Sequence, residues 1–170
     1  FSERPAEVRF VVYGDSRSRP EVHAAIARWF RKHDPDFILH TGDLVARGKQ
    51  YELWEKEFFG PLANVIDEIP LLSAIGNHET YSGTLADFPF LHIFTQPTAG
   101  ECGGVASGTP RYYSFDYGNI HFVALDSWIS DRSSNGPMWA WLQQDLAANR
   151  SDWLIAYWHY PPYSKGSHDS

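Results

Sequence analysis

Three short apolar segments constrain the fold of this chain most, because each is followed within two residues by a glycine and then by an acidic or amide residue. The segments are residues 8–13, 37–40 and 70–75, and the pairs that follow them are Gly14-Asp15, Gly42-Asp43 and Gly76-Asn77. Short apolar runs stopped by turn residues predict buried strands. Helical patterns lie between them, over residues 20–32 and over 49–59 with a resumption to 66 after Pro61. The order β-α-β-α-β predicts an α/β fold with a parallel sheet covered by helices.

The second half of the chain has a different pattern, in which a hairpin precedes a helix and a final strand. The expected elements are a short helix over 85–94, strands over 111–117 and 120–125, a helix over 136–149 and a strand over 153–158. The turn Tyr117-Gly118-Asn119 between the two adjacent strands is typical of a hairpin. The last strand ends at His159, so a histidine is expected at its carboxyl end.

The composition indicates one folded domain over residues 1–170. Hydrophobic residues make up 43% of the chain, enough for a packed core, and no apolar run reaches the ~20 residues of a membrane span. The net charge of −7 argues against nucleic acid as a stable partner but allows a small anionic substrate at a metal site. A single cysteine, Cys102, excludes an intrachain disulfide. The aromatic share of 16% favours an exported protein, periplasmic or extracellular.

The polar residues at the strand ends are candidate metal ligands. In open α/β sheets, ligands bind beyond the carboxyl ends of the strands, so residues distant in sequence can meet there. The residues concerned are Asp15, Asp43, Asn77, His78 and His159. Carboxylate and amide oxygens together with imidazole nitrogens suit hard or borderline divalent metals. The glycine before each of the first three positions permits the sharp turn that presents a side chain at a strand tip.

The run Gly76-Asn77-His78-Glu79 combines the groups that a hydrolytic site needs. Two cations ~3.5–4 Å apart can bridge the oxygens of a phosphate ester and stabilise the charge that develops on attack. A carboxylate such as Asp43 can bridge both ions. Asn77 would then bind metal, His78 would donate a proton to the leaving group, and Glu79 would orient His78.

Several sequence blocks, taken in order, resemble one family. The blocks are YGDSRS, HTGDLV, AIGNHET, NIHFVALDS and WHYPP. They resemble the calcineurin-like metallophosphoesterase superfamily, in particular its purple-acid-phosphatase-like members. The resemblance implies a four-layer α/β/β/α sandwich and hydrolysis of phosphate esters at a dinuclear site of Fe, Mn or Zn. It also implies that Asp15 binds the first metal, Asp43 bridges both, Asn77 and His159 bind the second, and His78 assists catalysis.

Arg17 is the first departure from the family pattern. The family's first block is usually Asp-x-His, and here it is Asp15-Ser16-Arg17. Purple acid phosphatases also lack that histidine and use a tyrosine three residues after the bridging aspartate, a position that is Ala46 here. An arginine cannot coordinate a metal. Either the first metal is weakly held, or the forked donors of Arg17 bind the substrate phosphate.

The second departure is a Gly-His-x-His block that the family has downstream of the equivalent of His159. The last residues here, Gly166 to Ser170, contain only His168. We therefore expect the sandwich to be incomplete at the C-terminus, through truncation, nicking or incomplete resolution. A C-terminal fragment of the same protein is expected to complete the site.

Three functions stay open on the sequence alone. Hydrolysis of a small phosphorylated monoester is the first expectation, and a phosphodiesterase of the same superfamily is the alternative. A catalytically inactive scaffold domain is the third. Among other histidines, His40 and His121 are interpreted as structural, and His168 as exposed tail. Asp126 is expected to cap a loop or to hydrogen-bond the loops near the site.

Overall fold

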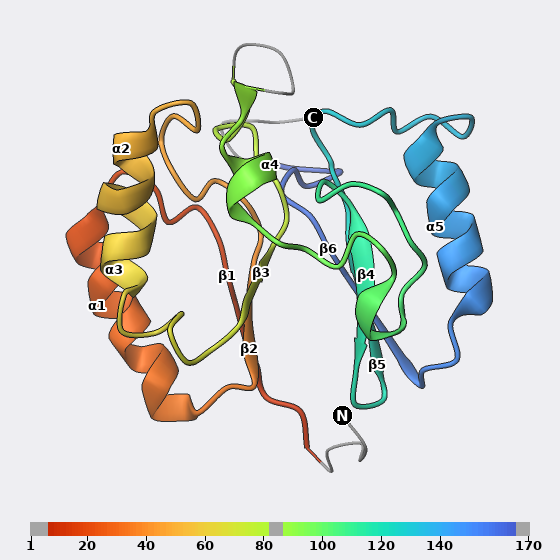
Figure 1. The fold of residues 1–170 in the computed structure, drawn as a ribbon, viewed down its shortest axis with the longest axis horizontal. Helices are drawn as coiled ribbons and strands as arrows, with labels where there is room; N and C mark the ends of the chain where they lie inside the picture. The colour runs from red at the N-terminus through yellow and green to blue at the C-terminus, as the bar shows by residue number, and fades with distance from the viewer. Residues whose placement is uncertain (1–6, 82–86, 166–170) are drawn as a thin grey trace.

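The computed structural model describes residues 7–81 and 87–165, and within these ranges it is built in four layers. Two three-stranded sheets pack face to face among the described residues, and helices cover their outer faces (Figure 1). The four-layer α/β/β/α sandwich predicted from the sequence is therefore confirmed. No helix in the described part of the chain is long and apolar enough to cross a membrane.

The first sheet is parallel, as the β-α-β-α-β pattern predicts. It contains β1 (Phe10–Tyr13), β2 (Phe37–His40) and β3 (Leu71–Ser73) in the order β1-β2-β3. The register pairs Phe10 with Phe37 and Ile38 with Leu71. Because the strands are parallel and in sequence order, their carboxyl ends lie at one edge of the sheet.

The outer face of the first sheet is covered by helical segments that pack through one apolar cluster. These are α1 (Pro20–Phe30), the 3-10 turn η1 (Arg31–His33), α2 (Tyr51–Leu53), the π-helical turn η2 (Trp54–Phe59) and α3 (Gly60–Leu62). The chain stays helical through Pro61, where the sequence predicts an interruption. Proline has no N–H to donate to Glu57, and the carbonyl of Glu57 instead lies 2.9 Å from Nδ1 of His23.

The second sheet contains the predicted hairpin and the final strand. β4 (Tyr113–Tyr117) pairs antiparallel with β5 (Ile120–Ala124), and β5 pairs parallel with β6 (Trp153–Tyr157). Helix α5 (Pro137–Ala148) covers its outer face (Figure 1). The helix expected over 85–94 is shorter among the described residues, where α4 spans Phe90–Ile93. The turn η4 (Glu101–Gly103) precedes the hairpin.

The two sheets are joined by a layer of aromatic side chains. Phe37 of the first sheet meets Phe122 of the second edge to face, with ring centroids 5.2 Å apart. Phe115 stacks on Phe122 at 4.9 Å, and Tyr113 donates its hydroxyl to the carbonyl of Ser73. This layer fixes one sheet against the other, so the loop after β6 comes to lie beside the loops of the first sheet.

Candidate metal centre

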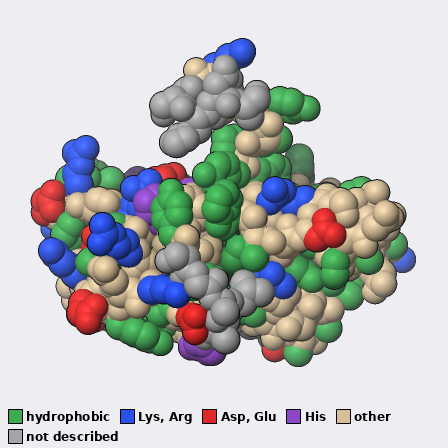
Figure 2. Space-filling model, turned by 90° about the horizontal axis from the view of Figure 1, so that it is seen from above, with side chains coloured by type: hydrophobic (Ala, Val, Ile, Leu, Met, Phe, Trp, Pro, Cys, Tyr) green, Lys and Arg blue, Asp and Glu red, His purple; other side chains and the backbone are tan. Residues whose placement is uncertain are grey.

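Loops at the carboxyl ends of β1, β2, β3 and β6 bring the predicted site residues together. Ligand atoms of Asp15, Asp43 and His159 all lie within 4.8 Å of one another. Asp15 is exposed, Asp43 is buried and His159 is half-buried, so the group runs from the surface inward. In a view down onto this edge, most of the visible Lys and Arg side chains gather over the first sheet and its helices (Figure 2).

His159, Asn77 and Asp43 face one point. Nε2 of His159 lies 3.1 Å from Oδ1 of Asn77 and 3.3 Å from Oδ1 of Asp43. Nδ1 of His159 donates to the carbonyl of Thr41 at 3.1 Å, which leaves the Nε2 lone pair directed at the two oxygens. A backbone carbonyl that fixes the ring in this way is typical of a metal-binding histidine.

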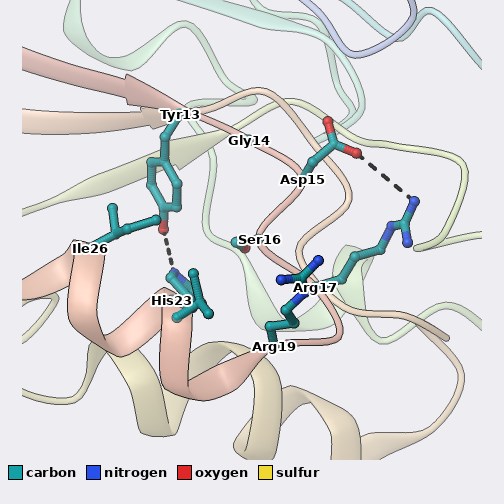
Figure 3. Close-up of a pocket in the computed structure, with 9 residues that line it drawn as sticks. Tyr13, Gly14, Asp15, Ser16, Arg17, Arg19, His23 and Ile26 are labelled. Carbon is teal, nitrogen blue, oxygen red and sulfur yellow. Dashed lines mark hydrogen bonds and ion pairs between the residues drawn. The ribbon is translucent and has the colours of Figure 1, made fainter.

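Arg17 lies against the other oxygen of Asp43. Its Nε donates to Oδ2 of Asp43 at 2.8 Å, and its Nη2 lies 4.0 Å from Oδ1 of Asp15. Figure 3 shows the ion pair of Arg17 with Asp15, and both residues line a hollow together with Arg19. The guanidinium therefore lies beside both carboxylates that the family resemblance places at the first metal, Asp15 as its ligand and Asp43 as the bridge to the second.

Glycines permit the close approach of the site loops. A Cβ on Gly42 would lie 3.0 Å from Cβ of His159, and one on Gly76 would lie 2.4 Å from Oδ1 of Asp43. Gly42 has a φ of 101°, and both metal-ligand candidates Asp15 and Asp43 have left-handed backbones, with φ of 52° and 60°. Left-handed non-glycine residues cluster at functional sites, where the surrounding structure holds the strain.

Glu79 joins the loop after β2 to the loop after β3. Its buried carboxylate accepts backbone N–H bonds from Asp43 at 2.9 Å and from Gly76 at 2.8 Å. It also accepts N–H bonds from the two residues after Asp43, Leu44 at 2.8 Å and Val45 at 3.3 Å. Burial, with the nearby charge of Asp43, raises the pKa of Glu79 to about 7, and the N–H bonds oppose that rise. Its role is to hold the loops and not, as the sequence suggested, to orient His78.

His78 is oriented by a backbone carbonyl. Its Nδ1 donates to the carbonyl of Ala46 at 2.8 Å, and its Nε2 lies 3.8 Å from Oδ2 of Asp43. The N–H of Ala46 in turn donates to the buried carboxylate of Glu57 at 2.7 Å. With Nδ1 engaged, Nε2 is the ring atom directed at the site and able to exchange a proton there.

The comparison with family models agrees with this geometry. The model of the calcineurin-like phosphoesterase family matches residues 8–170. The chain belongs to this family. The resemblance noted in the sequence blocks is thereby confirmed at the level of the calcineurin-like phosphoesterases.

Similar proteins of this family are purple acid phosphatases. Purple acid phosphatase 15 of Arabidopsis thaliana is 37% identical over 118 residues, covering 61% of this chain and 19% of the relative. Purple acid phosphatase 23 is 32% identical over 140 residues, covering 78% and 29%. A third Arabidopsis relative, "Probable inactive purple acid phosphatase 9", is 28% identical over 162 residues, covering 76% and 24%. The chain thus spans less than a third of the length of each of these relatives.

A solved purple acid phosphatase from yellow lupin (Lupinus luteus) seeds has the same fold. It superposes with a TM-score of 0.66 at 21% sequence identity, covering 92% of this chain and 31% of that one. The match extends through both sheets, so the four-layer arrangement is that of calcineurin-like phosphoesterases.

Membership of the calcineurin-like phosphoesterases implies bound metal ions, and part of the site offers suitable donor atoms. Oδ1 of Asp43, Oδ1 of Asn77 and Nε2 of His159 supply two oxygens and one imidazole nitrogen, which suits Fe, Mn or Zn. The position of the first metal ion is different, because the cationic side chain of Arg17 lies there beside the carboxylates of Asp15 and Asp43.

His40 is a residue of the site that sequence reasoning assigned only a structural role. Its Nδ1 accepts the N–H of Gly42 at 3.1 Å, so its Nε2 donates to the hydroxyl of Ser16 at 2.9 Å. Complete burial lowers the pKa of His40 to about 3, which keeps the ring neutral. It joins the loop that carries Asp15 to the loop that carries Asp43. The alternation of strand side chains gave no signal for this contact.

Other candidate residues lie apart from the site. His121 is buried and hydrogen-bonded to Asp116 and Asp145, which agrees with a structural role but through polar contacts. Asp126 accepts the N–H groups of the three residues that follow Ser127, which is a loop-capping arrangement. His168 lies outside the described residues.

Two hollows lie near the site. The Arg17 hollow, of about 330 Å³, is lined by Asp15, Arg17 and Arg19 among others. The Trp128 hollow, of about 530 Å³, is lined by Trp128, Trp139, Tyr160 and Arg132 among others. The ring of Tyr160 contacts the ring of His159 edge to face at 5.4 Å, so the second hollow borders the metal centre.

Proposed function

We propose that this protein hydrolyses phosphate esters at a metal centre, with phosphomonoesters as the preferred substrates. One observation carries the proposal: an imidazole, an amide oxygen and a carboxylate converge on one point, beside a second imidazole that can transfer a proton. Bound metal ions would supply Lewis-acid activation of the phosphate and of the attacking water. A dinuclear centre of Fe, Mn or Zn is what the family resemblance implies for such a site.

The residues of the chain would share the remaining work. Asp43, Asn77 and His159 hold metal, and Asp15 is the exposed carboxylate at the mouth of the site. His78 holds a proton at Nε2 for the leaving oxygen, with its ring fixed by the carbonyl of Ala46. Arg17 presents a permanent positive charge to an approaching phosphate.

A phosphodiesterase is the second candidate, and the two hollows favour it. A phosphodiester has a second substituent on its phosphorus, and two hollows near the metal centre offer room for substituents. The aromatic lining of the Trp128 hollow suits a flat or apolar substituent, since Trp128 and Tyr160 stack at 5.4 Å.

An inactive scaffold is the third candidate. Arg17 stands where the family pattern has a metal ligand, and one relative has a name that describes it as probably inactive. The convergence of Asp43, Asn77, His78 and His159 on one point is an argument against this candidate.

Export from the cytosol, a small phosphorylated substrate and a further segment that adds metal ligands also remain proposals.

The test compares a phosphomonoester with a phosphodiester on the purified metal-loaded protein. Turnover of p-nitrophenyl phosphate well above that of bis(p-nitrophenyl) phosphate would support a monoesterase, and the reverse order would support the alternative. Asp43→Asn should abolish both hydrolysis and metal retention. The control is Asp67→Asn, because Asp67 is an exposed aspartate outside the site. Full activity in Asp43→Asn would contradict the proposal, and absence of all hydrolysis in the wild type would favour the scaffold.

A further inference from the structure

The two oxygens of the Asp43 carboxylate face different groups. Oδ1 lies 3.3 Å from Nε2 of His159 and accepts the N–H of His78 at 3.1 Å. Oδ2 accepts a hydrogen bond from Nε of Arg17 at 2.8 Å. A carboxylate that bridges two metal ions would offer one oxygen to each. Here one oxygen faces the imidazole and amide donors, and the other is engaged by a guanidinium.

The position of Arg17 is built into the fold by contacts outside the ion pair. The N–H of Asp15 donates to the carbonyl of Gly42 at 3.0 Å, and the hydroxyl of Ser16 lies 2.9 Å from Nε2 of His40. The two residues before Arg17 are therefore tied to the loop that carries Asp43. The Asp43 side chain is 2% exposed, so its partner Arg17 compensates a charge that water does not reach.

A metal ion at this position would have to displace the guanidinium. Arginine stays protonated at every accessible pH and has no lone pair to offer, so it repels a cation instead of binding it. Displacement would break a hydrogen-bonded ion pair to a buried carboxylate. This is strongly unfavourable unless metal binding releases more free energy than the loss of the pair costs. Asp15, the other carboxylate of that position, also has Arg17 as a neighbour, at 4.0 Å.

We propose that the guanidinium of Arg17 takes the place of the first metal ion, so that this protein binds a single catalytic metal ion, at Asp43, Asn77 and His159. Arg17 then supplies the second positive charge of the centre, and its remaining N–H groups face the substrate phosphate. The metal stoichiometry follows from the geometry alone, whereas the role toward phosphate rests on the proposed function.

The test counts metal ions on the purified protein. We expect elemental mass spectrometry and Mn²⁺ titration calorimetry to give one ion per chain in the wild type. Arg17→His, which restores the family's ligand, should give two. Arg19→His is the control, because Arg19 lines the same hollow from an exposed position, and it should leave one ion. Two ions, or none, in the wild type would overturn the inference.

Electron paramagnetic resonance of the Mn²⁺-loaded wild type gives an answer that does not depend on the variants folding. An isolated ion gives the spectrum of a single Mn²⁺, and a pair gives the signature of spin coupling, which would contradict the proposal. The assay of ester hydrolysis is separate from both measurements. One ion without hydrolysis would support this inference against the proposed function, and two ions with hydrolysis would do the opposite.

Discussion

Nδ1 of His78 lies 2.8 Å from the carbonyl oxygen of Ala46, and this bond sets the direction of the catalytic candidate's ring. Ala46 stands three residues after Asp43, so the loop that carries the buried carboxylate also orients the imidazole. The N–H of Ala46 is held by Glu57 of the π-helical turn η2. The helix layer thus reaches the site through one backbone peptide.

Replacement of His78 should separate proton transfer from metal binding. We expect His78→Ala to slow turnover ~10²-fold or more, as for a lost general acid, while metal content per chain stays unchanged. Steady-state kinetics and elemental mass spectrometry of the same preparation measure both. The control is His33→Ala, an exposed histidine after α1. If His78→Ala lost its metal, the residue would have to be reassigned as a ligand.

Replacement of Glu79 should destabilise the fold. In Glu79→Gln, one side-chain oxygen becomes an NH₂ group that faces backbone N–H groups, either those of Asp43 and Gly76 or those of Leu44 and Val45. Leaving buried donors unpaired costs ~1–3 kcal/mol in the free energy of unfolding, which urea denaturation measures. Glu52→Gln, at an exposed glutamate of α2, is the matched control. Equal stability of the two variants would show that the N–H bonds of Glu79 are unimportant.

Gly76→Ala should weaken metal binding although it replaces no ligand. The new Cβ would lie 2.4 Å from Oδ1 of Asp43, the oxygen that faces His159, so the carboxylate must move. Shifts of this kind in groups that orient ligands cost ~10–100-fold in metal affinity, which calorimetric titration reports. Gly108→Ala is the control for backbone strain, since its φ is 68° but a Cβ there meets nothing within 4 Å. Unchanged affinity in Gly76→Ala would argue against Asp43 as a ligand.

The pairing of His121 with Asp145 predicts a pH dependence of stability. Burial opposes the charged ring of His121, but the hydrogen bonds to Asp145 and Asp116 outweigh it and raise its pKa above 6.5. A raised folded-state pKa stabilises fully below 6.5, and this contribution is lost as pH rises through the folded value. Burial raises the pKa of Asp145, but its bonds to His121 and Ser114 outweigh this and lower it below 3.8, so its contribution is present above 3.8 and lost on acidification.

Both pKa shifts therefore contribute fully to the free energy of unfolding between pH 3.8 and 6.5. We expect the difference in free energy of unfolding between wild type and His121→Gln to be larger at pH ~5.5 than at pH ~8.5. His33→Gln, at an exposed histidine, should show no such trend. A difference that is the same at both pH values would mean that folding does not shift the pKa of His121, and a smaller difference at pH ~5.5 would mean that folding lowers it.

The identity and order of the elements could be predicted because they depend on local patterns. Apolar runs stopped by Gly-Asp or Gly-Asn marked the strands of the first sheet, and the hairpin turn at Gly118 marked the second. The prediction of the elements failed where a tertiary contact stabilises a conformation that the local pattern disfavours. The chain stays helical through Pro61 because His23 takes the carbonyl that proline cannot serve.

The sequence by itself determined that Asp15, Asp43 and Asn77 would meet, because parallel strands in sequential order bring their carboxyl ends to one edge. His159 follows β6 of the second sheet, so its place beside them depends on the packing of the two sheets. Only the tertiary structure decided which atom faces which. Thr41 and His159 are 118 residues apart, Glu79 and Asp43 are 36 apart, and Arg17 and Asp43 are 26 apart. Such contacts depend on how two sheets and four loops pack, to within a fraction of an ångström, and no local pattern in the chain encodes that distance.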